Sequence, residues 1–219
     1  MKWFSALNLE TDSLAAVNAV IADLKAKLGD STPDLVMLYV SPQHKRDYIG
    51  IGEIVRKELR PRHLLGCSAG GVIGDAREAE QAHAISLTAA LLPDVEIVPF
   101  RLEDSTLPDM DSGPRTWEQV LQVKPSSDPH FIVLADPFSI RAEEMLAGMD
   151  FAYPKANKIG GLASGARRPG QNALYLDDKI YNEGAIGVSL SGNVAVETLV
   201  AQGCRPVGKP MAITKCYRN

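Results

Sequence analysis

The sequence predicts an α/β fold built from two tandem copies of one unit. Each copy runs helix, strand, helix, strand with glycine loop, and β-hairpin, with mixed sheets. Three observations support this prediction: apolar runs of strand length follow Pro33 and Pro129, glycine loops begin at Gly66 and Gly160, and the flanking elements share one order. Self-similarity at a long period is typical of repeated units. Chance similarity between two ordinary βα units is the alternative.

The first unit is assigned to residues 1–101. The stretch Thr11-Asp12-Ser13 can cap a helix that has apolar residues at every third or fourth position and stops at Gly29. The run at 35–40 has the length of a buried strand, and residues 48–59 show a second helical pattern. The strand candidates 84–89 and 95–98 flank a turn signal and therefore predict a β-hairpin.

The second unit is assigned to residues 114–207, after an acidic, proline-containing joint at about 102–113. Its expected elements are a short helix around Trp117, a strand over 130–135, a helix over 140–149, a short strand over 173–176, and a hairpin of 185–190 with 194–198. The repeated order predicts that the two glycine loops occupy equivalent places.

Composition and charge argue against several classes of function. The 219 residues carry a net charge of −4 and no long basic block, so nucleic acid and anionic membranes are not expected partners. No apolar run has the length of a signal peptide or a membrane span. Three cysteines without a C-x-x-C pair indicate neither a disulfide framework nor a zinc site. We expect a cytoplasmic protein without a cofactor or a metal.

Residues 66–70 match G-x-S-x-G, the pattern of a serine nucleophile turn. Such a turn needs a helix directly after the serine, and a histidine and an acid later. Gly71 and Gly74 follow within a few residues and disfavour that helix. A ligand-contacting loop is therefore preferred over catalysis by Ser68 or Cys67. A hydrolase remains an alternative, and so does a loop that only packs tightly.

The two loops share small residues, whose free backbone N–H groups can hold a carboxylate or phosphate. Asp136 follows the second central strand and can bind an amine or cap a helix, while Arg167 and Arg168 can pair with a ligand carboxylate, form a surface ion pair or lie in solvent. No catalytic residue is assigned. The candidate ligand-binding residues are Gly66, Cys67, Ser68, Ala69, Gly70, Gly71, Asp136, Gly160, Gly161, Ser164, Gly165 and Arg167.

Four segments carry a family resemblance: LGCSAGGVI at 65–73, GGLASG at 160–165, GAIGVSLSG at 184–192 and AQGCRPVG at 201–208. They resemble the amino-terminal half of FIST proteins (F-box and intracellular signal transduction). The resemblance implies a sensory module for small molecules such as amino acids, without established catalytic residues. It also implies that residues 208–219 begin a missing or truncated carboxyl-terminal half.

We therefore expect a cytoplasmic, non-enzymatic sensory domain for signal transduction. It would bind a small molecule such as an amino acid or a small carboxylate and would pass its signal to a protein partner. The alternatives are a hydrolase that uses Ser68 or Cys67 and a protein-binding adaptor.

Overall fold

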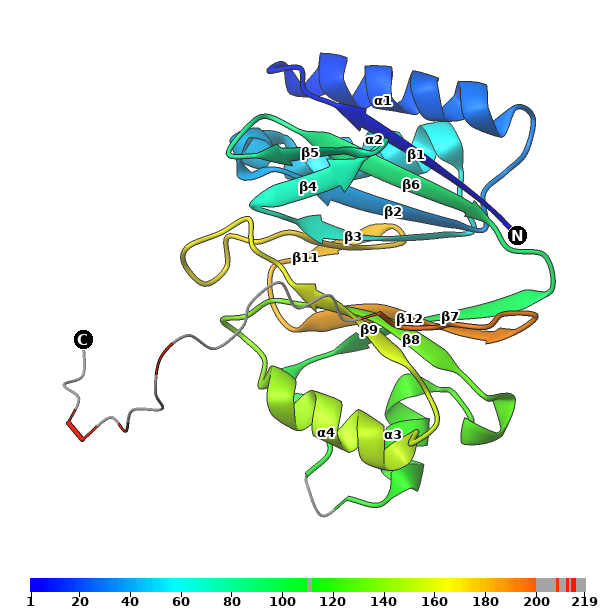
Figure 1. The fold of residues 1–219 in the computed structure, drawn as a ribbon, viewed down its shortest axis with the longest axis vertical. Coiled ribbons are helices and arrows are strands. Elements are labelled where there is room, and N and C mark those ends of the chain that lie inside the picture. The colour runs from blue at the N-terminus through cyan, green and yellow to red at the C-terminus, as the bar shows by residue number, and fades with distance from the viewer. Residues whose placement is uncertain (110–111, 200–207, 209–211, 213, 216–219) are drawn as a thin grey trace.

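The computed structural model describes residues 1–109, 112–199, 208, 212 and 214–215. Its elements stack in four layers, in the order helices, sheet, sheet, helices (Figure 1). The first half of the chain contributes β1 (Lys2–Asn8), α1 (Ser13–Leu28), β2 (Leu35–Val40), the 3-10 helix η1 (Pro42–Asp47), α2 (Tyr48–Leu59), β3 (His63–Ser68), β4 (Gly71–Gly74), β5 (Arg77–Glu80) and β6 (Ile85–Leu91).

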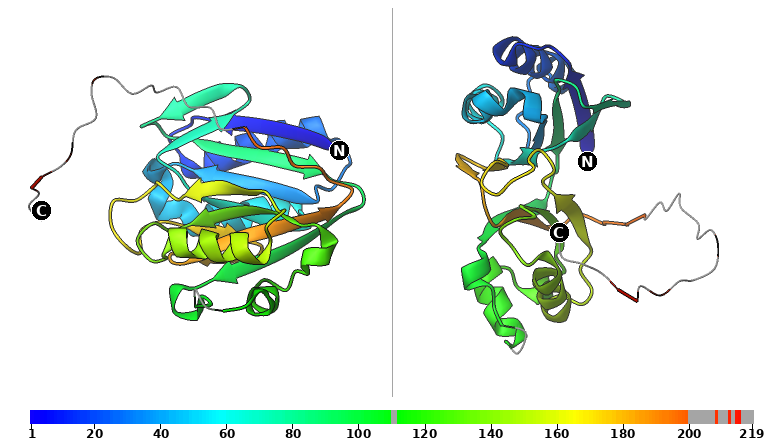
Figure 2. Two further views of the ribbon diagram at one scale, coloured as in Figure 1. Left: turned by 60° about the horizontal axis from the view of Figure 1, so that its bottom comes forward. Right: turned by 90° about the vertical axis from the view of Figure 1, so that its left-hand side faces the viewer.

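The second half supplies the lower sheet with its helices and also two strands of the upper sheet, β10 and β11. Its elements are β7 (Val95–Leu102), η2 (Asp104–Thr106), α3 (Pro114–Leu121), η3 (Pro125–Ser127), β8 (His130–Ala135), α4 (Ala142–Ala152), β9 (Lys158–Leu162), β10 (Leu174–Leu176), β11 (Lys179–Tyr181) and β12 (Ala185–Gly192). Figure 2 shows the same stack from two further sides.

Two mixed sheets lie face to face. The upper sheet has the order β1-β6-β2-β3-β10-β11 and the lower sheet β7-β12-β8-β9. In the upper sheet β2 and β3 are parallel, while β6 runs antiparallel to both β2 and β1. The lower sheet repeats this arrangement: β8 and β9 are parallel, while β12 runs antiparallel to both β8 and β7. The predicted mixed α/β class is confirmed. The common strand order is compatible with duplication, which stays a prediction.

Apolar side chains fill each of the three spaces between layers. One cluster joins α1 and α2 to the upper sheet, a second lies between the sheets, and a third joins the lower sheet to α3 and α4. Both faces of the central strands are therefore covered. This explains why β2 and β8 are continuous apolar runs rather than alternating ones.

Helix α1 begins and ends where local signals predict. The carboxylate of Asp12 accepts a hydrogen bond from the Ala15 backbone N–H at 2.8 Å. Gly29 follows the last turn with a φ of +61°, which a glycine adopts without strain. The second hairpin of the chain, β10–β11, was predicted only as a short strand. It crosses to the upper sheet, where β10 pairs antiparallel with β3.

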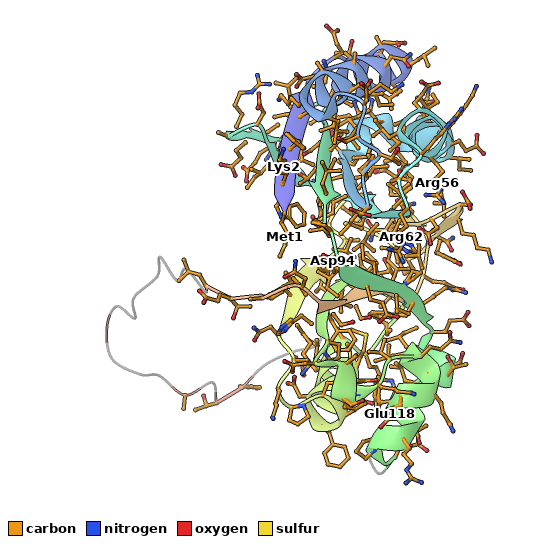
Figure 3. The ribbon with its side chains drawn as sticks, turned by 90° about the vertical axis from the view of Figure 1, so that its right-hand side faces the viewer. Met1, Lys2, Arg56, Arg62, Asp94 and Glu118 are labelled. Carbon is orange, nitrogen blue, oxygen red and sulfur yellow. The ribbon has the colours of Figure 1, made fainter. Side chains whose placement is uncertain are left out.

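Two predicted hairpins were wrong. Strands β6 and β7 belong to different sheets, and the chain passes from one to the other beside Asp94, which Figure 3 labels between the layers. Residues 194–198 form no strand after β12. A turn signal marks where the chain reverses, but it does not specify which strands then form hydrogen bonds. The change of sheet thus precedes the predicted joint at 102–113.

Strand β1 was not predicted, and it pairs with β6 at the edge of the upper sheet. The segment 208–219, expected to begin a second half, lies largely outside the described residues. No helix in the described ranges combines the length and the apolar character needed to cross a bilayer.

Candidate functional site

The two glycine loops, residues 66–71 and 160–165, lie side by side and bond to each other. The Gly70 N–H donates to Ser164 Oγ at 3.0 Å, and the Gly165 N–H donates to the Ser68 carbonyl at 3.2 Å. A Cβ atom added to Gly165 would lie 2.6 Å from the Ser68 Cβ atom. The loops are therefore in direct contact, and no ligand fits between them at this point.

The loop amides that were expected to hold a ligand are largely occupied. The Ala69 N–H donates to the Val40 carbonyl at 2.9 Å, and the Ala163 N–H donates to the Ala135 carbonyl at 2.8 Å. Together with the Gly70 and Gly165 bonds, these contacts tie the loops to the strand ends. A ligand near the loops has to be held mainly by side chains.

Gly66 and Gly160 are required by packing between parallel strands. A Cβ atom at Gly66 would lie 2.0 Å from the Leu38 carbonyl oxygen of β2, and one at Gly160 would lie 1.7 Å from the Val133 carbonyl oxygen of β8. These distances are shorter than any non-bonded contact. Both glycines therefore allow two backbones to approach closely, which is the packing alternative stated for the loops.

Ser68 belongs to a buried polar network beneath the loops. Its side chain is fully buried; Oγ donates to Asn172 Oδ1 at 2.9 Å and accepts from the Ala173 N–H at 3.0 Å. Asn172 Nδ2 in turn donates to Asp136 Oδ1 at 2.8 Å. The second carboxylate oxygen of Asp136 accepts from Ser139 Oγ at 2.6 Å. The network joins the first loop to the end of β8.

This arrangement does not favour a nucleophile at Ser68 or Cys67. The hydroxyl of Ser68 bonds to an amide oxygen rather than to a base, and the segment after it is strand β4 instead of a helix. Burial raises the pKa of the Cys67 thiol to about 12, so the reactive thiolate is rare at neutral pH. His63 is the first residue of β3, and its side chain interacts with Asp177.

A surface hollow of about 720 Å³ opens beside the paired loops, and we call it the seam hollow. One wall comes from η1, Gly70 and the residue after β5, and the other from the loop between β9 and β10. The hollow thus lies where the parallel strands of both sheets have their carboxyl ends, a common place for ligands in α/β proteins. Its lining residues are Pro42, Gln43, Lys45, Gly70, Gln81, Ser164, Gly165, Ala166, Arg167, Arg168 and Gln171.

Six polar side chains of the seam hollow have no protein partner within the described part of the chain. They are Gln43, Lys45, Gln81, Arg167, Arg168 and Gln171. No acidic residue is among the described lining residues. Several other cations are paired with carboxylates, as Arg56 is with Asp178 at 2.8 Å. The hollow is therefore a cationic site on a chain of net negative charge.

The structure separates the twelve candidate residues into groups. Gly70, Ser164, Gly165 and Arg167 line the seam hollow. Gly66, Cys67, Ser68 and Asp136 lie in the interior, while Ala69 and Gly71 lie at the loop without lining the hollow. Gly160 and Gly161 line a separate, mostly apolar hollow of about 280 Å³ next to α4.

Sequence reasoning did not assign most of the charged and amide side chains of the seam hollow. Gln43 and Lys45 lie three and five residues after the end of β2, in η1, where the strand-end rule that singled out Asp136 also applies. Arg168 was considered as a carboxylate partner together with Arg167 but was not among the candidate residues. Gln81 and Gln171 carry no local signal, because only the fold brings them to the hollow.

The family follows from a comparison with known domain models. The model of the FIST N domain matches residues 34–219. The chain belongs to the FIST family. This agrees with the glycine loops and the strand after them, which carried the resemblance in the sequence.

Curated relatives of this FIST N domain cover nearly its whole length. An uncharacterized protein of Mycobacterium tuberculosis is 28% identical over 203 residues, which are 93% of this chain and 51% of the relative. An uncharacterized protein of Mycobacterium bovis is 26% identical over 200 residues, which are 91% of this chain and 50% of the relative. The chain spans about half the length of the relatives that it matches.

Proposed function

We propose that this FIST N domain is a cytoplasmic sensory module that binds a small molecule in the seam hollow. An amino acid or a small carboxylate is the expected kind of ligand. The observation that carries the proposal is the set of six lining side chains without a protein partner among the described residues, at the carboxyl ends of the parallel strands. A volume of about 720 Å³ is within the usual range of ligand sites.

The position of the hollow suggests how binding can produce a signal. One wall belongs to the first half of the chain and the other to the loop after β9, so a ligand that contacts both walls stabilises one relative placement of the two sheets. The bonds between the glycine loops and the network around Asn172 connect these walls to both sheets. A protein partner that reads this placement is part of the proposal.

A ligand screen tests the proposal. The full chain is heated with each of the common amino acids and a set of small carboxylates, and hits are measured by calorimetry. A ligand at about 100 times its Kd is expected to stabilise the fold by about 2.7 kcal/mol. The variant Arg167→Gln should weaken the hit, whereas Arg60→Gln, at the end of α2, should not.

A screen without hits would contradict the proposed function. So would a hit that Arg167→Gln, Arg168→Gln and Gln171→Ala all leave unchanged. The adaptor alternative is favoured by the absence of a pocket between the two glycine loops, and these loops are in direct contact at Gly165. The small-molecule proposal therefore depends on the hollow beside the loops. The hydrolase alternative requires that an activity probe label Ser68 or Cys67 rapidly. Both side chains are buried, which argues against such labelling.

A further inference from the structure

We infer that the ligand of the seam hollow is a compact dianion whose two anionic ends are held by Lys45 on one wall and by Arg167 and Arg168 on the other. This inference rests on the proposed function and specifies its ligand. Dicarboxylates and phosphorylated carboxylates share this chemistry, an anionic group at each end.

The charge balance of the hollow favours two negative charges over one. Lys45, Arg167 and Arg168 all face the same hollow, and no carboxylate of the described lining offsets them. Three like charges around one space repel each other, and a dianion removes more of this repulsion than a monoanion does. Four other hollows on the described surface each include an aspartate or a glutamate in their lining.

The three cationic side chains lie on two different walls of the hollow, which favours a ligand with an anionic group at each end. Lys45 belongs to η1, directly after β2, whereas Arg167 and Arg168 belong to the loop between β9 and β10. An arginine guanidinium can bind a carboxylate or phosphate through two parallel hydrogen bonds, and a lysine acts as a compact positive charge. The two walls thus offer two separate anion positions.

The remaining lining residues indicate what lies between the charged ends. Gln43, Gln81 and Gln171 provide amide donors and acceptors without a protein partner among the described residues. No aromatic side chain is among the described lining residues, so a nucleotide base would lack a stacking surface. A small polar skeleton with hydroxyl or amino groups fits this lining better than an aromatic or aliphatic one.

Matched ligands test the charge requirement on the full chain. Calorimetry compares succinate with butyrate, which has the same carbon number but one carboxylate, and 2-phosphoglycolate with ethyl phosphate, which lacks the carboxylate. The compounds with two anionic ends are expected to bind at least about tenfold more tightly than their matched partners. Whether succinate or 2-phosphoglycolate binds more tightly distinguishes the dicarboxylate source from the phosphate source.

Matched variants test the two walls. Lys45→Gln should weaken dianion binding about tenfold while changing butyrate binding little. Arg168→Gln should act in the same direction. The control is Lys57→Gln, since Lys57 lies on α2 away from the seam hollow. All three side chains are exposed, and unchanged melting temperatures without ligand would show that the variants fold.

The possible outcomes separate this inference from the proposed function. Tighter dianion binding that depends on Lys45 supports both. Equal binding of succinate and butyrate, or dianion binding insensitive to Lys45→Gln, overturns the dianion inference. Binding of neutral amino acids alone at the hollow also overturns it but leaves the proposed function intact. Absence of any binding across the screen overturns both.

Discussion

Replacing Ser68 with alanine removes one buried oxygen atom that makes two hydrogen bonds. Oγ donates to Asn172 Oδ1 and accepts from the Ala173 N–H, and the side chain is fully buried. Without Oγ, both groups remain in the interior without these partners. A buried polar group that loses its partner costs about 1–3 kcal/mol, so we expect Ser68→Ala to lower the free energy of unfolding by about 2–4 kcal/mol.

Urea unfolding followed by circular dichroism measures this loss. With an m-value of about 2–3 kcal/mol/M, the midpoint should fall by roughly 1 M. Ser164→Ala is the matched control, because Ser164 is exposed and its Oγ accepts one bond, from the Gly70 N–H. The control should change stability by less than about 1 kcal/mol.

The result that refutes this reasoning is an unfolding midpoint for Ser68→Ala equal to that of the parent chain. It would mean that the network around Asn172 does not contribute to stability. If the same variant also abolished an activity at unchanged stability, the structural role assigned to Ser68 would be replaced by a catalytic one.

Three further predictions follow from particular groups. Gly160→Ala should destabilise the fold by at least about 1–3 kcal/mol, because the new Cβ meets a β8 carbonyl at 1.7 Å, whereas Gly161→Ala has nothing within 4 Å and should melt near the parent temperature. Equal melting temperatures would contradict the packing assigned to this loop. Burial, and then a neighbouring histidine, lowers the pKa of His44. As the pH falls, His44 therefore binds a proton in the unfolded chain before it does so in the folded chain. The free energy of unfolding should be highest above about pH 6.5 and should decrease as the pH drops below that value. His44→Gln should flatten this dependence in urea titrations at several pH values, and an unchanged slope would exclude His44 as its source. Iodoacetamide should modify Cys67 only after unfolding, since burial raises its pKa to about 12; peptide mass spectrometry showing rapid modification of Cys67 in the folded chain would contradict this.

Elements with strong local signals were predictable from the sequence. Asp12 and Gly29 define α1 because a capping side chain and a glycine with positive φ act on the adjacent backbone. The apolar runs of β2 and β8 reflect burial on both faces. The family motifs were also readable, because they lie in continuous segments.

The candidate site was predicted only in part. The sequence identified Gly70, Ser164, Gly165 and Arg167, which line the seam hollow. It also assigned ligand contact to Ser68 and Asp136, which both bond to the side chain of Asn172 in the interior. A polar residue after a strand can face the ligand or the core, and its sequence context is the same in both cases.

The amino-acid sequence by itself determined the α/β class, the order of most elements and the family of this chain, because these depend on patterns among near neighbours. The tertiary structure decided that β6 and β7 separate into two sheets, that β10 pairs with β3, and that Lys45 and Arg167 share one hollow. These outcomes depend on how two sheets pack face to face. Packing brings together residues more than a hundred positions apart, and no local pattern encodes that meeting.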